Sequence, residues 1–164
     1  MQTRTKRAYL SAALASVLAV PLGATVLAQS TDSQVGTWKL NLAKSKYSPG
    51  PAPKSATTKI VAVGAGTKVS VDNVQADGSM GHWEFTANYD GKDNPMIGNN
   101  PNADTVARTR INATTIQTIS KKGGKVTTTQ TSEVSADGKT RTVITKGVNA
   151  AGQTVHNVAV YDRQ

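Results

Sequence analysis

The residues best suited to chemistry in this chain are the base and carboxylate of His82-x-Glu84. Residues two apart on a β-strand face the same side, so the two side chains would lie together there. His156 could join them across a barrel, and Arg108 could complete an enzyme site at the barrel mouth. A metal or catalytic site needs a further convergent group that the sequence does not place. We therefore expect no catalytic residues, no metal and no cofactor, and a solvent-facing polar strand at His82 and Glu84.

Other catalytic classes lack the residues they require. The chain contains no cysteine, so thiol nucleophiles, thiolate metal sites and disulfides are excluded. It also lacks a Gly-x-Ser-x-Gly elbow and a phosphate-binding glycine loop. Stability must therefore come from a packed core alone.

A second kind of chemistry, the binding of a small molecule, is suggested by residues 80–89. Strand alternation places Trp83, Phe85, Ala87 and Tyr89 on one face, which is the better candidate for a barrel interior. For Trp83, a role in a ligand-binding wall and a role as core filler are equally compatible with this pattern.

Three further residues are candidates for the same site. Tyr161 in the last strand could offer a hydrogen bond, although the alternation there does not decide which face points inward. Arg108 could supply a charge together with Arg110, but an exposed arginine on the barrel exterior is the interpretation we favour. Tyr47, just before a proline-rich segment, could cap the barrel mouth or pack against it. The candidate ligand-binding residues are Trp83, Phe85, Tyr161, Arg108 and Tyr47.

Glycine-containing turns divide the rest of the chain into strands that would position these side chains. Asp77-Gly78, Asp90-Gly91, Gly123-Gly124, Asp137-Gly138 and Ala151-Gly152 separate runs rich in Thr and Val, which predicts tight two-residue hairpins. We expect an all-β protein with one up-and-down antiparallel barrel of about 8–10 strands. The expected strands are 35–41, 57–63, 67–74, 80–89, 104–111, 114–121, 125–134, 139–148 and 154–163, with a short strand and a loop within 91–103.

The first 28 residues have the pattern of a secretory signal peptide. Arg4, Lys6 and Arg7 precede an apolar run, and small residues end the segment at Ala28. The apolar run is interrupted by Pro21 and is shorter than the roughly 20 residues of a membrane span. We expect residues 1–28 to be removed, residues 29–164 to form the barrel domain, and the mature protein to be periplasmic or secreted without a membrane span.

The net charge and the distribution of Lys and Arg indicate which partners the protein could bind. The formal net charge is +9 for the whole chain and +6 without residues 1–28. Lysine and arginine are spread over nearly every expected strand, without the aromatic-interleaved clusters of a nucleic-acid groove. We expect no nucleic-acid partner and a monomer with a solvated basic surface, which could attract anionic envelope components non-specifically.

Several motifs carry a resemblance to a known group of barrels. Gly36-Thr37-Trp38 resembles the Gly-x-Trp signature of the calycin superfamily, which comprises lipocalins and fatty-acid-binding proteins. The ending at 158–163 resembles the closing strand of fatty-acid-binding proteins, and the mature chain is similar to exported bacterial lipocalin-like proteins of unknown function. The resemblance implies that Trp38 closes one barrel end and packs beneath an arginine, here Arg163.

The chain also departs from the fatty-acid-binding pattern. Those proteins hold a carboxylate with Arg-x-Tyr in the last strand, whereas here Ala159 precedes Tyr161. The proline-rich segment 48–53 stands where their helical lid would be. The leading hypothesis is an exported barrel that binds a small apolar or amphiphilic ligand. The alternatives are a non-catalytic envelope interaction protein and, less favoured, an enzyme with a site at the barrel mouth.

Overall fold

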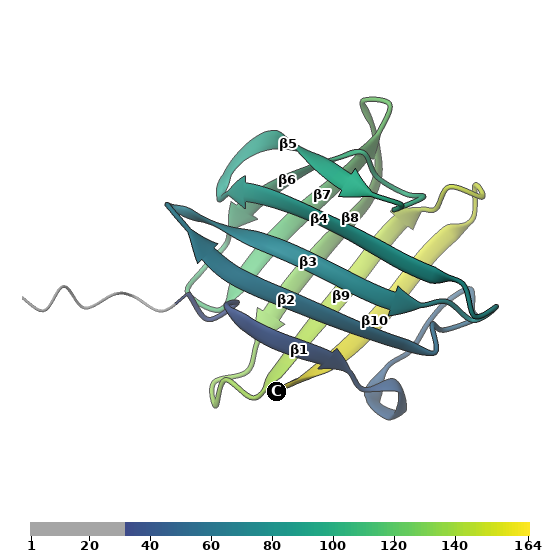
Figure 1. Cartoon of the computed structure of the whole chain (residues 1–164), viewed down its shortest axis with the longest axis horizontal. Coiled ribbons are helices and arrows are strands. Elements are labelled where there is room, and N and C mark those ends of the chain that lie inside the picture. Colours follow the sequence, from purple (N-terminus) through teal and green to yellow (C-terminus); the bar gives the residue numbers. More distant parts are fainter. Residues whose placement is uncertain (1–31) are drawn as a thin grey trace, which may run out of the picture.

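The barrel seen in the computed structural model is built from strands that pair with their neighbours in sequence. The structure describes residues 32–164, so the predicted signal peptide lies outside the described residues. The antiparallel ladder runs from strand to strand and closes where the first strand pairs with the last (Figure 1). The elements are β1 (Gly36–Leu40), the 3₁₀ helix η1 (Leu42–Lys44), β2 (Ser55–Val63), β3 (Gly66–Val74), β4 (Met80–Asn88), β5 (Asp90–Gly98), β6 (Thr105–Arg110), β7 (Thr115–Lys122), β8 (Lys125–Val134), β9 (Thr140–Val148) and β10 (Thr154–Arg163). The prediction of a single all-β, up-and-down barrel is confirmed.

Of the five predicted glycine turns, one has the expected length and three are longer, whereas Asp90 and Gly91 are the first residues of β5 and only Tyr89 connects β4 to β5. Gly123 and Gly124 both have positive φ and form the two-residue connection between β7 and β8. The Asp77-Gly78, Asp137-Gly138 and Ala151-Gly152 pairs instead lie in five-residue loops, at 75–79, 135–139 and 149–153. In each of these loops the glycine N–H donates to the carbonyl three residues earlier, at Gln75, Ser135 and Asn149. The prediction of two-residue hairpins at these three sites is therefore wrong.

Strand β5 is longer than the short strand expected within 91–103. It tolerates Pro95 because Met96 N donates to Asp104 O on the β6 side, so the proline nitrogen faces β4. The pairing of β5 with β4 is confined to residues 96–98, so no ladder hydrogen bond is lost there. The pairing of β5 with β6 changes register between Asp90 and Asp93, where the ladder is irregular.

Two groups of buried apolar residues fill part of the barrel. One contains Trp38, Ile60, Val69, Phe85, Ala87, Val106 and Val134, and the other contains Leu40, Ala56, Val143 and Ala159. Tyr161 packs against both groups. The β4 face with Phe85 and Ala87 is inside, as predicted, and His82 is exposed on the other face. In β10, where the sequence left the orientation open, Ala159 is buried and His156 is exposed.

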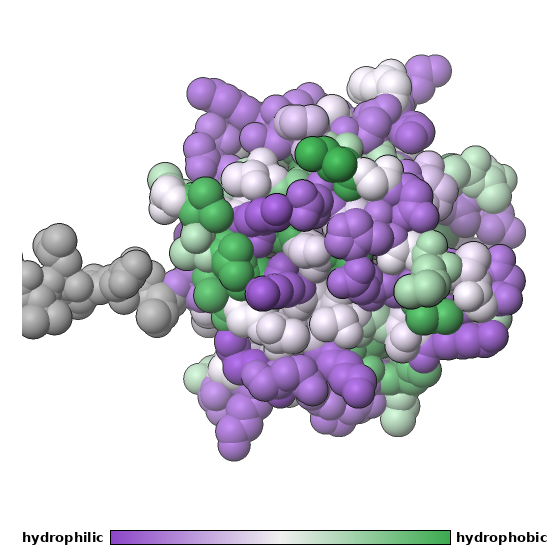
Figure 2. Space-filling model, in the orientation of Figure 1, coloured by the Kyte–Doolittle hydropathy of each residue, from purple (hydrophilic) through white to green (hydrophobic). Residues whose placement is uncertain are grey.

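The two ends of the barrel differ. Residues 32–38 close one end, where Gln34 and Trp38 are completely buried. At the other end, the 48–53 segment and the loops 75–79, 99–104 and 149–153 lie side by side. The outer face in front is mostly hydrophilic or neutral, with scattered hydrophobic residues (Figure 2). Within residues 32–164, no helix has the length and apolar character needed to cross a membrane.

Candidate functional site

The barrel interior contains a partly open cavity of about 180 Å³. Its walls are the inward-facing side chains of nine strands, β2 to β10, together with Tyr47 and Asn100 from the connecting segments. The lining residues are Tyr47, Thr58, Val69, Val71, Trp83, Phe85, Met96, Asn100, Val106, Arg108, Thr118, Ser120, Gln130, Arg141, Val143, Thr145, Asn157, Ala159 and Tyr161. This set contains all five residues that the sequence analysis named as candidates for ligand binding.

The two candidates on β4 are held by strand alternation. Trp83 and Phe85 lie opposite Val71 and Val69 of β3 in the ladder, so an aromatic pair and an aliphatic pair form one continuous surface. Phe85 is buried and Trp83 is half-buried. These two rings provide the flat apolar part of the cavity.

Tyr47 reaches the cavity because the segment that carries it is fastened to β10. Lys46 and Val158 exchange two backbone hydrogen bonds, each of 2.8 Å. Burial, followed by the proximity of Tyr161, raises the pKa of the Tyr47 hydroxyl above its ordinary value. Burial also raises the pKa of Tyr161, and the charge of Arg141 offsets part of this effect. Both hydroxyls therefore stay protonated near neutral pH and can donate a hydrogen bond.

Arg108 lies inside the barrel, so the favoured interpretation of an exterior arginine is wrong. Its side chain is 1% exposed, and its Nη1 donates to Thr67 Oγ1. The guanidinium carbon lies 5.0 Å from the centre of the Tyr89 ring and 5.8 Å from that of Phe85. Within residues 32–164, Arg108 Nε is buried without a hydrogen-bond partner. Burial lowers the pKa of Arg108, although the neighbouring Tyr89 and Asp32 oppose this.

A second inward arginine, Arg141 on β9, was missed by the sequence analysis. It is the direct cross-strand neighbour of Tyr161, and its guanidinium carbon lies 5.8 Å from the centre of that ring. Its Nε donates to Ser132 Oγ at 2.7 Å and to Gln34 Oε1 at 3.2 Å. Burial lowers the pKa of Arg141 to about 10. One face of residues 140–145 has Arg, Val and Thr and the other has Thr, Thr and Ile, so strand alternation does not indicate which way Arg141 points.

The closed end of the barrel holds a separate cluster around Asp32. Arg110 Nη2 donates to Asp32 Oδ2 at 2.7 Å, and the Tyr89 hydroxyl donates to the same oxygen. The Arg110 guanidinium carbon lies 4.0 Å from the centre of the Tyr89 ring. Burial alone would raise the pKa of Asp32, but these hydrogen bonds and one from Gln34 N outweigh it and lower the pKa. Asp32 is therefore an anion that is already paired.

The hypothesis of an enzyme site at the barrel mouth does not match the geometry. Glu84 pairs with Lys68 at 3.0 Å on the outside, whereas Arg108 is inside. His82 Nδ1 lies 2.7 Å from Asp72 Oδ1. His156 is also exposed, on β10. Within residues 32–164, no group of three or more His, Cys, Asp or Glu side chains is placed to hold a metal ion.

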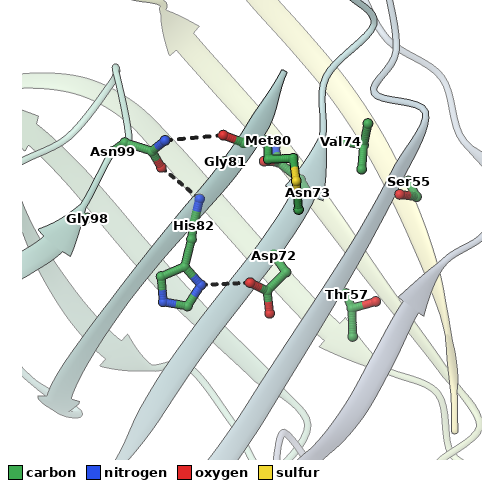
Figure 3. Close-up of a pocket in the computed structure, with 10 residues that line it drawn as sticks. All are labelled: Ser55, Thr57, Asp72, Asn73, Val74, Met80, Gly81, His82, Gly98 and Asn99. Carbon is green, nitrogen blue, oxygen red and sulfur yellow. Dashed lines mark hydrogen bonds and ion pairs between the residues drawn. The ribbon is translucent and has the colours of Figure 1, made fainter. Parts of the chain in front are cut away.

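His82 and Asp72 instead belong to an open groove on the outer face of β2, β3 and β4. The groove has a volume of about 410 Å³. Thr57, Asp72 and His82 follow one another across the three strands, and Asn99 donates to Met80 O while it accepts from His82 N (Figure 3). Asp72 and His82 are well exposed, so the groove is a wet surface feature.

No protein-family model matches the chain, and no curated protein matches it. Among solved structures, the chain is similar to the zebrafish ileal bile acid-binding protein complexed with cholic acid. The sequence identity is 12%, the TM-score is 0.45, and the similarity covers 80% of this chain and 99% of that chain. The barrel architecture itself follows from the closed ladder of strand pairs.

Proposed function

We propose that this protein binds a small amphiphilic molecule inside its barrel. The observation that carries the proposal is the interior cavity of about 180 Å³, which is lined by aromatic rings and by hydroxyl, amide and guanidinium groups. Ligand sites are generally concave and largely apolar, with a few polar groups that fix orientation. Trp83 and Phe85 would stack on the apolar part of the ligand, and Tyr161 would donate a hydrogen bond.

The cellular setting of this activity is part of the proposal. The cationic and apolar pattern of residues 1–28 supports export, after which the barrel would act in the periplasm or outside the cell. The absence of cysteine means that the barrel needs no disulfide to fold there. A monomer without a nucleic-acid partner remains the expectation from the sequence.

The proposal is tested by filling the cavity. Ala159 lines it, and Ala159→Leu would place three more carbons inside the barrel. Val160→Leu adds volume on the other face of the same strand and serves as the matched control. The probe is the neutral, single-ring compound 4-hydroxybenzamide, followed by backbone amide NMR shifts in the ¹⁵N-labelled protein.

The wild type and Val160→Leu should show saturable shifts around Trp83, Phe85 and Tyr161. Ala159→Leu should fold, as judged by its dispersed spectrum, and lose these shifts. Saturable shifts that persist unchanged in the filled variant would place the binding outside the cavity and overturn the proposal. The same conclusion follows if 4-hydroxybenzamide and its carboxylate analogue both fail to shift the interior residues.

A further inference from the structure

The cavity contains two buried cations and no buried anion to match them. Arg108 and Arg141 are 1% and 8% exposed. Among the lining residues of the described chain, there is no Asp or Glu. Burying an unpaired charge costs free energy, so buried charges are usually paired with a neighbouring opposite charge. Here the nearby carboxylate of Asp32 is already engaged by Arg110 and Tyr89.

Both arginines lie toward the closed end of the barrel. Arg141 contacts Gln34, and Arg108 lies over the Tyr89 ring, whose hydroxyl contacts Asp32. The groups that they contact directly are neutral: the hydroxyl of Thr67, the amide of Gln34, the hydroxyl of Ser132 and aromatic rings. The charge of Arg108 also contributes to the lowered pKa of Arg141, after the effect of burial.

Gln34 and Ser132 fix the direction of Arg141. Both accept a hydrogen bond from Nε. Gln34 is itself completely buried, and its Nε2 donates to Thr114 O at 2.8 Å. Within residues 32–164, the hydrogen bonds of Arg141 involve Nε alone, which leaves the terminal Nη1 and Nη2 donors for a group in the cavity.

The remaining walls differ from one side of the cavity to the other. From β3 to β5 and at Val106 of β6, the lining side chains are apolar. From β7 to β10 they are mostly polar, apart from Val143 and Ala159. The polar side is formed by Thr118, Ser120, Gln130, Arg141, Thr145, Asn157 and Tyr161. A ligand with a polar head and a long apolar tail would leave many of these groups without partners.

The volume of the cavity limits the size of the ligand. Pockets for drug-sized ligands have volumes of roughly 300–1,000 Å³, and this cavity of about 180 Å³ is smaller. It suits a single ring or a short chain better than a long-chain lipid.

From these observations we infer that the ligand is a compact organic anion, with one ring face against Trp83 and Phe85 and hydrogen-bonding groups along the opposite edge. Its anionic group is bound at the closed end by Arg108 and Arg141. This inference rests on the proposed function, because it specifies the chemistry of a ligand in the same cavity. Gln34 is a positioning residue that orients Arg141.

The test compares two probes of nearly equal shape, 4-hydroxybenzoate and 4-hydroxybenzamide, by calorimetry with the full mature chain at pH 7. A charge-assisted hydrogen bond that is kept only by the anion should make the benzoate bind about tenfold tighter. Arg141→Gln and Arg108→Gln should each remove most of this preference. Lys59→Gln, which removes an exposed charge on β2, should leave it unchanged. Gln34→Met should reduce the preference without abolishing binding of the amide.

A second measurement avoids reliance on the variants. The benzoate should raise the thermal midpoint of the wild type more than the amide at equal concentration. In backbone amide NMR spectra, hexadecanoate should cause no saturable shift at the interior residues. Equal affinity for benzoate and amide would overturn the anion site and leave the proposed function intact. Tighter binding of hexadecanoate would overturn the limit on ligand size, and failure of every probe would count against the proposed function as well.

Discussion

The guanidinium carbon of Arg163 lies 4.1 Å from the centre of the Trp38 ring, which fastens the last strand to the first across the seam of the barrel. The same side chain donates to three carbonyl oxygens, at Val35 (2.6 Å), Ser33 (2.9 Å) and Gly138 (2.5 Å). It therefore joins β10, the β8–β9 loop and the segment that closes the barrel end. The contact between Trp38 and an arginine at this position, implied by the family resemblance, is present.

Replacement of Arg163 by alanine should lower the free energy of unfolding by about 2 kcal/mol, since several charge-assisted hydrogen bonds and a cation–π contact are lost at a partly solvated site. Arg163→Lys should recover only part of this loss, because an ammonium cannot reproduce the planar fork of donors. Urea denaturation followed by tryptophan fluorescence measures both values. Equal stability of the lysine variant and the wild type would contradict this account of the site.

Gly36 has φ +145°, and a Cβ there would collide with Arg163 Nη1. Gly36→Ala should therefore cost about 2 kcal/mol of stability, from backbone strain and from displacement of the arginine. Gly123→Ala is the matched control, because Gly123 also has positive φ but a Cβ there would meet no atom within 4 Å. The control should be the less destabilised of the two.

A double-mutant cycle separates the two causes at Gly36. In an Arg163→Ala background, Gly36→Ala should cost less than in the wild type, because the colliding group has gone. Strictly additive effects in urea denaturation would show that the collision does not matter.

Asp32 should contribute stability that disappears in acid. Its pKa is held below the ordinary value of 3.8, mainly by hydrogen bonds from Arg110 and Tyr89 that outweigh burial. A group with a depressed folded-state pKa stabilises the fold above its unfolded pKa and loses this effect as pH falls through the folded pKa. Asp32→Asn should therefore be less stable than the wild type near pH 7, and the two should converge below about pH 4.

Denaturation in urea at pH 7, 5, 4 and 3 measures this convergence. Asp162→Asn provides the comparison, since Asp162 also has a lowered pKa, through Asn41 and Lys44, but lies on the surface. At pH 7 its stability difference from the wild type should be smaller than that of Asp32→Asn. A constant difference between the wild type and Asp32→Asn from pH 7 to 3 would contradict the assigned role of Asp32.

The inward direction of Trp83 and Phe85 could be predicted because β4 alternates cleanly between large apolar and polar residues. In β6 and β9, small or polar residues occupy both faces, so the same reasoning could not place Arg108 or Arg141. It placed Arg108 outside, because a lone arginine is rarely buried. The barrel interior accepts it because Thr67 of β3, Phe85 of β4 and Tyr89 of the β4–β5 connection surround it. No pattern of neighbouring residues in the sequence predicts this arrangement.

The amino-acid sequence by itself determined the architecture, because strand length, side-chain alternation and the sites of chain reversal are local properties of neighbouring residues. Closure of the ladder also requires β1 to pair with β10, which is a contact between the two ends of the described chain. The chemistry of the cavity was decided by the tertiary structure alone. Register across the barrel brings Arg141 beside Tyr161 and Gln34, residues 20 and 107 positions away, and only that convergence produces a buried positive site.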